Sequence, residues 1–212
     1  MIKYNQIIYK SLIITTVLLI LGCTSKKTLP FFEKNQTLSI HDFSYKKEYH
    51  TISSFKLINQ NNEIITNEFY NDKLYVADFF FTNCPTICPG IKKNMLKIQN
   101  KYLKDNRVHL LSHTIDYKND TALILKKYMK KIGANENKWN FVYGAKNDIY
   151  EIARESYMAY IKEDSKEPGG FLHSGVLLLI DKNRYIRGVY DGSSNKDINI
   201  LIKDIKILLK EY

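Results

Sequence analysis

Two cysteines in the segment Cys84-Pro-Thr-Ile-Cys88-Pro89 are the residues of this chain with the clearest chemical potential. They follow the apolar run Leu74–Phe81, which predicts a buried strand, and Pro89 suits the first turn of a helix. Two thiols at such a junction can form a disulfide or bind one soft metal ion. His173, far along the chain, is a candidate third ligand. The pattern therefore predicts a copper site or a redox site.

The positions of the two thiols allow either chemistry. Cys88 is predicted near the start of a helix, where the helix dipole and unpaired backbone N–H groups lower the pKa of a thiol, and Cys84 lies in the preceding loop. Two thiolates and an imidazole suit Cu(I), and also Cu(II) when an oxygen donor joins them. Zinc would require a fourth protein ligand, which the pattern does not clearly supply. A small structural disulfide is a less favoured alternative, because so short a loop restricts few unfolded conformations.

The N-terminus is typical of an export signal. Lys3 and Lys10 provide positive charge, an apolar segment follows, and the segment ends in Ile20-Leu21-Gly22-Cys23, which resembles a bacterial lipoprotein signal. Cleavage would leave a lipidated Cys23 as the first residue. An uncleaved membrane anchor is the alternative, although the apolar run is shorter than the roughly 20 residues that span a bilayer. Both interpretations place the protein in the cell envelope, outside the cytoplasmic membrane and tethered to a bilayer.

This signal defines the expected domain organisation and limits the possible partners. We expect a signal peptide over residues 1–22, a tether over 23–45 and one domain over 46–212.

The formal charge is +10, of which Lys3 and Lys10 supply two. Lysines are scattered along the sequence without a basic tract, which indicates a solvated surface and no nucleic-acid partner. A less favoured interpretation is that the charge attracts anionic lipids or an acidic protein.

Strands and helices are expected to alternate along the domain. Thr51–Thr66 predicts a hairpin, and a later segment, Ala159–Gly170, predicts a mobile excursion. Central strands are expected at Leu74–Phe81, Val108–Ser112, Trp139–Tyr143 and Gly175–Asp181, and the last of them forms a hairpin with Tyr185–Tyr190. Helices are expected from Pro89 onward and at Asp120–Ile132, Asp148–Tyr157 and Ile198–Leu209. This order predicts an α/β, thioredoxin-like fold, with a central mixed sheet flanked by helices and an N-terminal hairpin extension.

Three aspartates are candidates for supporting roles near the thiols. Asp78 interrupts the first central strand, either as a half-exposed residue or as a group near the thiols. Asp120 is predicted to cap the following helix or to lie in its first turn. Asp116 is a candidate to orient His173 or a partner protein without binding the metal itself.

Three segments in the expected order resemble the Sco/SenC family, the thioredoxin-like, copper-binding assembly factors of cytochrome c oxidase. Residues 80–89 (FFTNCPTICP) resemble the copper motif of that family, and residues 114–121 (TIDYKNDT) resemble its Ser-x-Asp-Pro-x-x-Asp-Thr segment. Residues 172–174 (LHS) and 187–192 (RGVYDG) resemble its His-Ser segment and its final hairpin. The resemblance implies that Cys84, Cys88 and His173 bind copper, as Cu(I) or Cu(II).

The resemblance also implies a function, with one close alternative. A membrane-tethered copper chaperone would deliver copper to the binuclear copper site of a cytochrome c oxidase subunit. A thiol-disulfide oxidoreductase would instead keep the cysteines of that subunit, or of another copper protein, reduced, with Cys84 attacking and Cys88 resolving. A peroxidase-like activity is a weaker alternative, since the Thr-x-x-Cys environment with a nearby Arg is missing. His173 distinguishes the first two, because only the copper site needs it.

Overall fold

The computed structural model of this chain describes residues 28–32 and 49–211. The expected signal peptide, Cys23 and most of the expected tether lie outside these ranges. Within them, none of the helices combines the length and the apolar character that crossing a bilayer requires.

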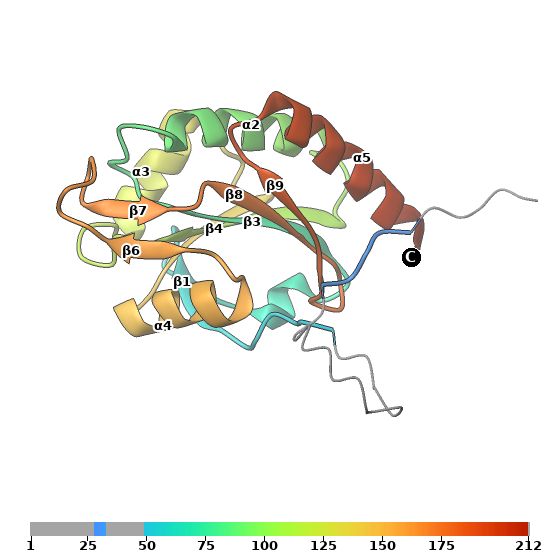
Figure 1. The fold of residues 1–212 in the computed structure, drawn as a ribbon, viewed down its shortest axis with the longest axis horizontal. Helices are drawn as coiled ribbons and strands as arrows, with labels where there is room; N and C mark the ends of the chain where they lie inside the picture. The colour runs from blue at the N-terminus through green and yellow to red at the C-terminus, as the bar shows by residue number, and fades with distance from the viewer. Residues whose placement is uncertain (1–27, 33–48, 212) are drawn as a thin grey trace, which may run out of the picture.

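One mixed sheet forms the centre of the described part of the molecule (Figure 1). The strands lie in the order β2-β1-β5-β4-β3-β8-β9, with β3 parallel to β4 and β4 parallel to β5. The bounds are β1 Lys56–Asn59, β2 Ile64–Thr66, β3 Leu74–Phe80, β4 Val108–Thr114, β5 Trp139–Tyr143, β8 Val176–Ile180 and β9 Ile186–Asp191. Strands β3 and β4 are buried along their whole length. This burial explains the nearly continuous apolar sequence of β3, whereas β4 also buries the polar residues His109, Ser112, His113 and Thr114. The predicted mixed sheet with an N-terminal hairpin at its edge is confirmed.

Helices cover both faces of this sheet, as predicted (Figure 1). Three of them, α2 (Cys88–Lys101), α3 (Ala122–Ile132) and α5 (Asn195–Glu211), lie on one face. The other face carries α4 (Lys146–Glu151), which continues as a π-helix over Ile152–Ser156. Each long helix buries one apolar stripe, and α3 ends at Gly133, which adopts the left-handed conformation with φ +81°.

A second, two-stranded sheet replaces the mobile excursion that the sequence predicts. Strand β6 (Ile161–Glu163) pairs antiparallel with β7 (Phe171–His173), and Ile161 lies opposite His173. The hairpin was missed because each strand has only three residues and charged residues interrupt the apolar pattern. Its second strand carries His173, so the element with the weakest sequence signal delivers a candidate ligand.

The described N-terminal segment, residues 28–32, lies beside β9 and the end of α5 (Figure 1). Arg187 is only 1 % exposed, and its guanidinium donates to the carbonyl oxygens of Leu29, at 2.8 Å, and Pro30, at 3.0 Å. It also donates to the carboxylates of Asp181 and Glu211, and the latter accepts the backbone N–H of Leu29. This part of the expected tether is therefore bonded to the domain, near the C-terminus of α5.

Candidate metal centre

The structure brings Cys84, Cys88 and His173 together. Each offers one ligand atom, and these three atoms lie within 4.8 Å of one another; no other such group of three occurs in the described ranges. The Sγ of Cys88 is 3.2 Å from Nε2 of His173. The two cysteines are not bonded to each other, and all three side chains are buried. A pair of thiols four residues apart has thus acquired a third donor from the far end of the chain.

The two cysteines are positioned by the junction between β3 and α2. Strand β3 ends at Phe80, and the backbone N–H of Cys84 donates to the carbonyl of Phe81 at 3.2 Å. Cys88 is the first residue of α2, with Pro89 following it. Because a helix leaves its first N–H groups without intrahelical partners, a thiol here lies in a positive local field.

The β6–β7 hairpin holds His173 over these cysteines. The ring of Phe171 lies 5.1 Å from that of Phe81, and the His173 ring meets Phe81 edge-on at 6.1 Å. Gly169 has φ +84°, and a Cβ atom there would lie 2.6 Å from the Phe81 ring. The hairpin therefore packs on the cysteine loop through a contact that leaves no room for a side chain at residue 169.

The two thiols differ in their proton affinity. Burial raises the pKa of Cys84, but hydrogen bonds from the Cys88 side chain and from the backbone of Thr86 and Cys88 outweigh it, so the pKa is lowered overall. Burial raises the pKa of Cys88, and the neighbouring Cys84 raises it further. Cys84 is thus the thiol that ionises first as the pH rises, and Cys88 keeps its proton to a higher pH.

The imidazole of His173 has the properties of a metal ligand. Burial lowers its pKa, which favours the neutral ring that metal ions bind. Its Nδ1 is buried and has no hydrogen-bond partner in the described residues. Bonds from a metal ion to nitrogen and sulfur are about 2.0–2.3 Å long, so three ligand atoms placed evenly around one ion lie about 3.5–4.0 Å apart. Three atoms within 4.8 Å of one another therefore need shifts of less than about 1 Å to hold one ion.

None of the three candidate aspartates forms a hydrogen bond with the thiols in the described residues. Asp78, which is buried, accepts two hydrogen bonds from Lys92, at 2.7 and 3.0 Å, and one from Ser112. Asp116 accepts hydrogen bonds from the backbone and side chain of Asn119, and so closes a turn after β4.

Asp120 does not cap the helix as the sequence predicts. The N-cap of α3 is Thr121, and it makes no side-chain capping bond. The carboxylate of Asp120 instead accepts the backbone N–H of Thr82 at 3.0 Å and the hydroxyls of Thr82 and Thr114. Because Thr82 precedes the cysteines by two residues, Asp120 fixes their loop to strand β4.

Lys92 is the neighbour of the site that sequence reasoning missed. It lies one helical turn after Cys88, is 1 % exposed, and its ammonium group sits 3.9 Å from the centre of the Phe80 ring. Its positive charge favours the thiolate form of Cys88. The available signal was a lysine at position i+4 from Cys88, on the helical face that also carries the buried Met95.

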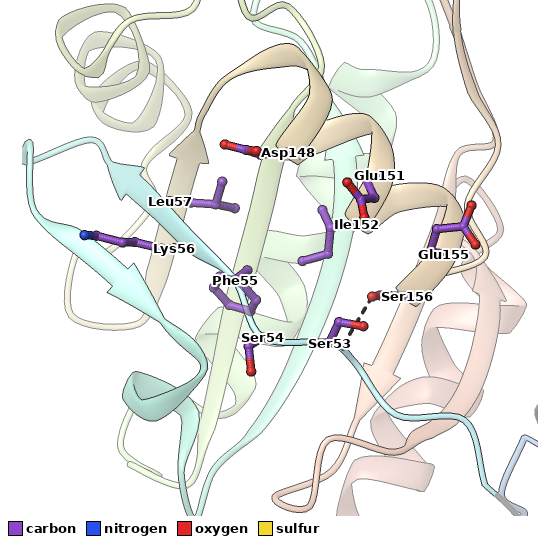
Figure 2. A pocket seen from close by; sticks show the side chains of 10 residues that line it. All are labelled: Ser53, Ser54, Phe55, Lys56, Leu57, Asp148, Glu151, Ile152, Glu155 and Ser156. Carbon is purple, nitrogen blue, oxygen red and sulfur yellow. Dashed lines mark hydrogen bonds between the residues drawn. The ribbon is translucent and has the colours of Figure 1, made fainter.

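A pocket of about 300 Å³ lies elsewhere, between residues 53–57 and the helix on the opposite face of the sheet (Figure 2). It is lined by Ser53, Ser54, Phe55, Lys56, Leu57, Asp148, Glu151, Ile152, Glu155 and Ser156, and so contains none of the three candidate ligands. The thiol–imidazole group is a compact buried cluster that lies outside this pocket. Such a cluster is better suited to binding a metal ion or to exchanging a disulfide than to binding a bulky substrate.

Comparisons with known proteins place the chain in one family. The SCO1/SenC family model matches residues 44–210. A SCO1/SenC family lipoprotein from Bacillus anthracis is 28 % identical, with a TM-score of 0.70 over 76 % of this chain and 95 % of that chain. BsSco, described as a member of the Sco family of cytochrome c oxidase assembly proteins with a disulfide switch, is 28 % identical, with a TM-score of 0.67 over 75 % of this chain and 93 % of its own.

The fold extends to a plant protein of lower identity. ScoI of Arabidopsis thaliana, solved with copper bound, is 23 % identical and has a TM-score of 0.64 over 76 % of this chain and 98 % of its own. That likeness supports the fold, and the family match spans most of the chain. The chain therefore belongs to the SCO1/SenC family and has its thioredoxin-like fold.

Proposed function

We propose that this protein binds one copper ion through Cys84, Cys88 and His173 and delivers it to the binuclear copper site of a cytochrome c oxidase subunit. The observation that carries this proposal is the convergence of two thiols and one imidazole within 4.8 Å, and burial lowers the pKa of that imidazole. This donor set suits copper, above all Cu(I). The description of BsSco as an oxidase assembly protein and the copper bound in the Arabidopsis protein support it.

Delivery would proceed by exchange of ligands at the exposed side of the site. Pro85, Thr86 and Ile87, between the two cysteines, are exposed, whereas Cys88 and His173 lie deeper. A thiolate of the recipient would approach along this loop and bind copper as the bond from copper to Cys84 breaks. The low pKa of Cys84 makes it the better leaving thiolate. Cys88 and His173 would release the ion last.

Thiol–disulfide exchange is the second function that the site supports. The lowered pKa of Cys84 and the raised pKa of Cys88 suit an attacking and a resolving thiol. The Cys84 thiolate would attack a disulfide of the recipient, form a mixed disulfide and release one recipient thiolate. Cys88 would then attack the Cys84 sulfur and release the second. The recipient disulfide is reduced, and the Cys84–Cys88 pair is oxidised.

One experiment separates the two functions. The copper-loaded protein is mixed with the metal-free copper domain of the oxidase subunit, and copper is measured in each protein after their separation. We expect most of the copper to move to the domain when its cysteines are reduced. If copper stays in place while an oxidised domain is reduced at the expense of the Cys84–Cys88 pair, the oxidoreductase function replaces the chaperone function.

We also propose that Cys23 carries a lipid and holds the protein in the cell envelope, outside the cytoplasmic membrane. The sequence around Cys23 supports this proposal, as does the description of the B. anthracis relative as a lipoprotein. Cells that express the wild-type chain should incorporate labelled fatty acid into it, and a Cys23→Ser chain should not. Equal labelling of the two chains, or no labelling of the wild type, would contradict the anchor.

A further inference from the structure

Folding gathers lysines that are scattered in the sequence onto one face of the molecule. Helices α2, α3 and α5 form the layer that covers this face of the sheet (Figure 1). Their exposed lysines are Lys93, Lys97, Lys101, Lys127, Lys130, Lys131, Lys196, Lys203, Lys206 and Lys210. None of them forms an ion pair with a carboxylate within residues 28–32 and 49–211. We call this layer the lysine face.

The acidic residues of the same helices do not neutralise this charge at the surface. Helices α2 and α3 contain no Asp or Glu, and the three acids of α5 are half-buried. Asp197 accepts the backbone N–H of Asp191, and Asp204 accepts the hydroxyl of Tyr190. Glu211 pairs with Arg187. Ten exposed lysines outnumber these three acids, so the lysine face carries a strong net positive charge.

Acidic residues instead gather on the opposite side of the sheet. Figure 2 shows Asp148, Glu151 and Glu155 along the helix that borders the 300 Å³ pocket, on the face that α4 covers. Lys56 beside the same pocket and Lys146 and Arg154 on the same helix offset these acids, so the domain has a positive side and an opposite side of nearly balanced charge. A negatively charged surface would therefore orient the domain with the lysine face toward it.

A lipid on Cys23 would place the α5 end of the lysine face near a bilayer. Residues 28–32 are bonded beside the C-terminus of α5 through Arg187. Only five peptide units separate Thr28 from Cys23, and a fully extended chain covers at most about 3.6 Å per residue, or about 18 Å in all. A lipid on Cys23 would hold the α5 end of the domain within this distance of the membrane.

We propose that the lysine face is a docking surface for anionic phospholipid headgroups, so that the domain lies on the membrane to which it is tethered. Ten lysines spread over three helices suit a diffuse layer of phosphate groups, because each ammonium acts as an independent point charge. This surface is separate from the copper site and goes beyond the proposed function. The anchor at Cys23 supports the proposal, but the test below does not depend on it.

The test measures vesicle binding by an unlipidated chain that begins at Thr24. This chain keeps the whole described core, which runs from Leu29 to Leu208. It is sedimented with vesicles of phosphatidylcholine alone and with vesicles of equal phosphatidylcholine and phosphatidylglycerol. We expect binding only to the anionic vesicles, and weaker binding at high salt because mobile ions screen exposed charges.

Two quadruple variants with the same net charge locate the binding surface. The face variant replaces Lys101, Lys130, Lys203 and Lys206 by Gln. The control variant replaces by Gln four exposed lysines that lie elsewhere, on β1, in the loop after β4 and in the β6–β7 hairpin: Lys56, Lys118, Lys162 and Lys166. The face variant should lose on the order of 100-fold in vesicle affinity, since each of the four lysines contributes a factor of about five or less near an anionic surface. The control should bind nearly as tightly as the wild type.

Several results would overturn the proposal. If the wild type fails to bind anionic vesicles, the lysine face does not recognise lipid, and an acidic protein becomes the partner to seek. Equal losses in the two variants would show that net charge, not this face, attracts the chain. None of the eight residues is a candidate copper ligand, so copper binding measured on the same variants tests the proposed function separately.

Discussion

Replacing His173 by Ala should lower the affinity of the protein for Cu(I) by at least about 100-fold. Loss of a residue that merely supports a metal ligand costs about 10–100-fold in affinity, and His173 is proposed to be a ligand itself. The two remaining thiolates would still bind copper, but more weakly and with an open coordination position. Phe81, whose ring meets the His173 ring, and Phe171, which packs on Phe81, offer no donor atom to replace the imidazole.

The measurement is a competition titration with a Cu(I) chelator of known affinity. His109→Ala is the matched control, because His109 is buried on β4, where it bonds to Asn106 and is not part of the thiol cluster. The control should bind copper as the wild type does. Disulfide exchange by Cys84 should survive in His173→Ala, since neither sulfur is removed. An unchanged copper affinity in that variant would remove His173 from the site.

Replacing Lys92 by Met should lower the free energy of unfolding by about 3–5 kcal/mol. The ammonium of Lys92 forms a buried ion pair with Asp78 at 2.7 Å and donates to Ser112 at 2.7 Å, where Trp139 also donates. Burial lowers the pKa of Lys92, and the Asp78 carboxylate opposes this shift. Removal of the lysine leaves a buried carboxylate without its counter-charge, and the cost of that charge is the main loss.

Urea unfolding of Lys92→Met and Lys93→Met measures the effect. Lys93 is the next residue of the same helix but is exposed, so its replacement should change the free energy of unfolding by less than about 0.5 kcal/mol. The double variant Asp78→Asn, Lys92→Met removes both charges and should recover part of the loss. If the two single variants are equally stable, the Lys92–Asp78 pair contributes nothing to the fold.

The central strands could be predicted because their burial leaves a direct mark in the sequence. Strand β3 is covered on both faces, and its apolar run Leu74–Phe81 coincides with the strand to within one residue. Strand β4 was predicted at Val108–Ser112 and ends two residues later, because the polar residues His113 and Thr114 are buried in it as well. The end of α3 at Gly133 could also be predicted, because glycine adopts the left-handed conformation at little cost. These features depend on local sequence and on burial alone.

Other features depend on contacts between distant segments and could not be predicted in this way. His173 lies 85 residues from Cys88, so the sequence offered it only as a candidate third ligand, and the family resemblance assigned it to the site. The role of Asp120 was wrongly predicted, because a carboxylate before a helix is a common cap, and its bonds to Thr82 and Thr114 arise only in the fold. The lysine face was missed for the same reason, since its lysines come from three separate helices.

The central claim is that one copper ion is bound by two sulfurs and one imidazole, and X-ray absorption at the copper edge tests it most directly. The reduced protein is loaded with one equivalent of Cu(I), and the neighbours of the metal are counted. We expect two sulfur neighbours and one imidazole nitrogen in the wild type, and one sulfur fewer in Cys88→Ser. Failure to retain one equivalent, or a metal surrounded by nitrogen and oxygen alone, would contradict it.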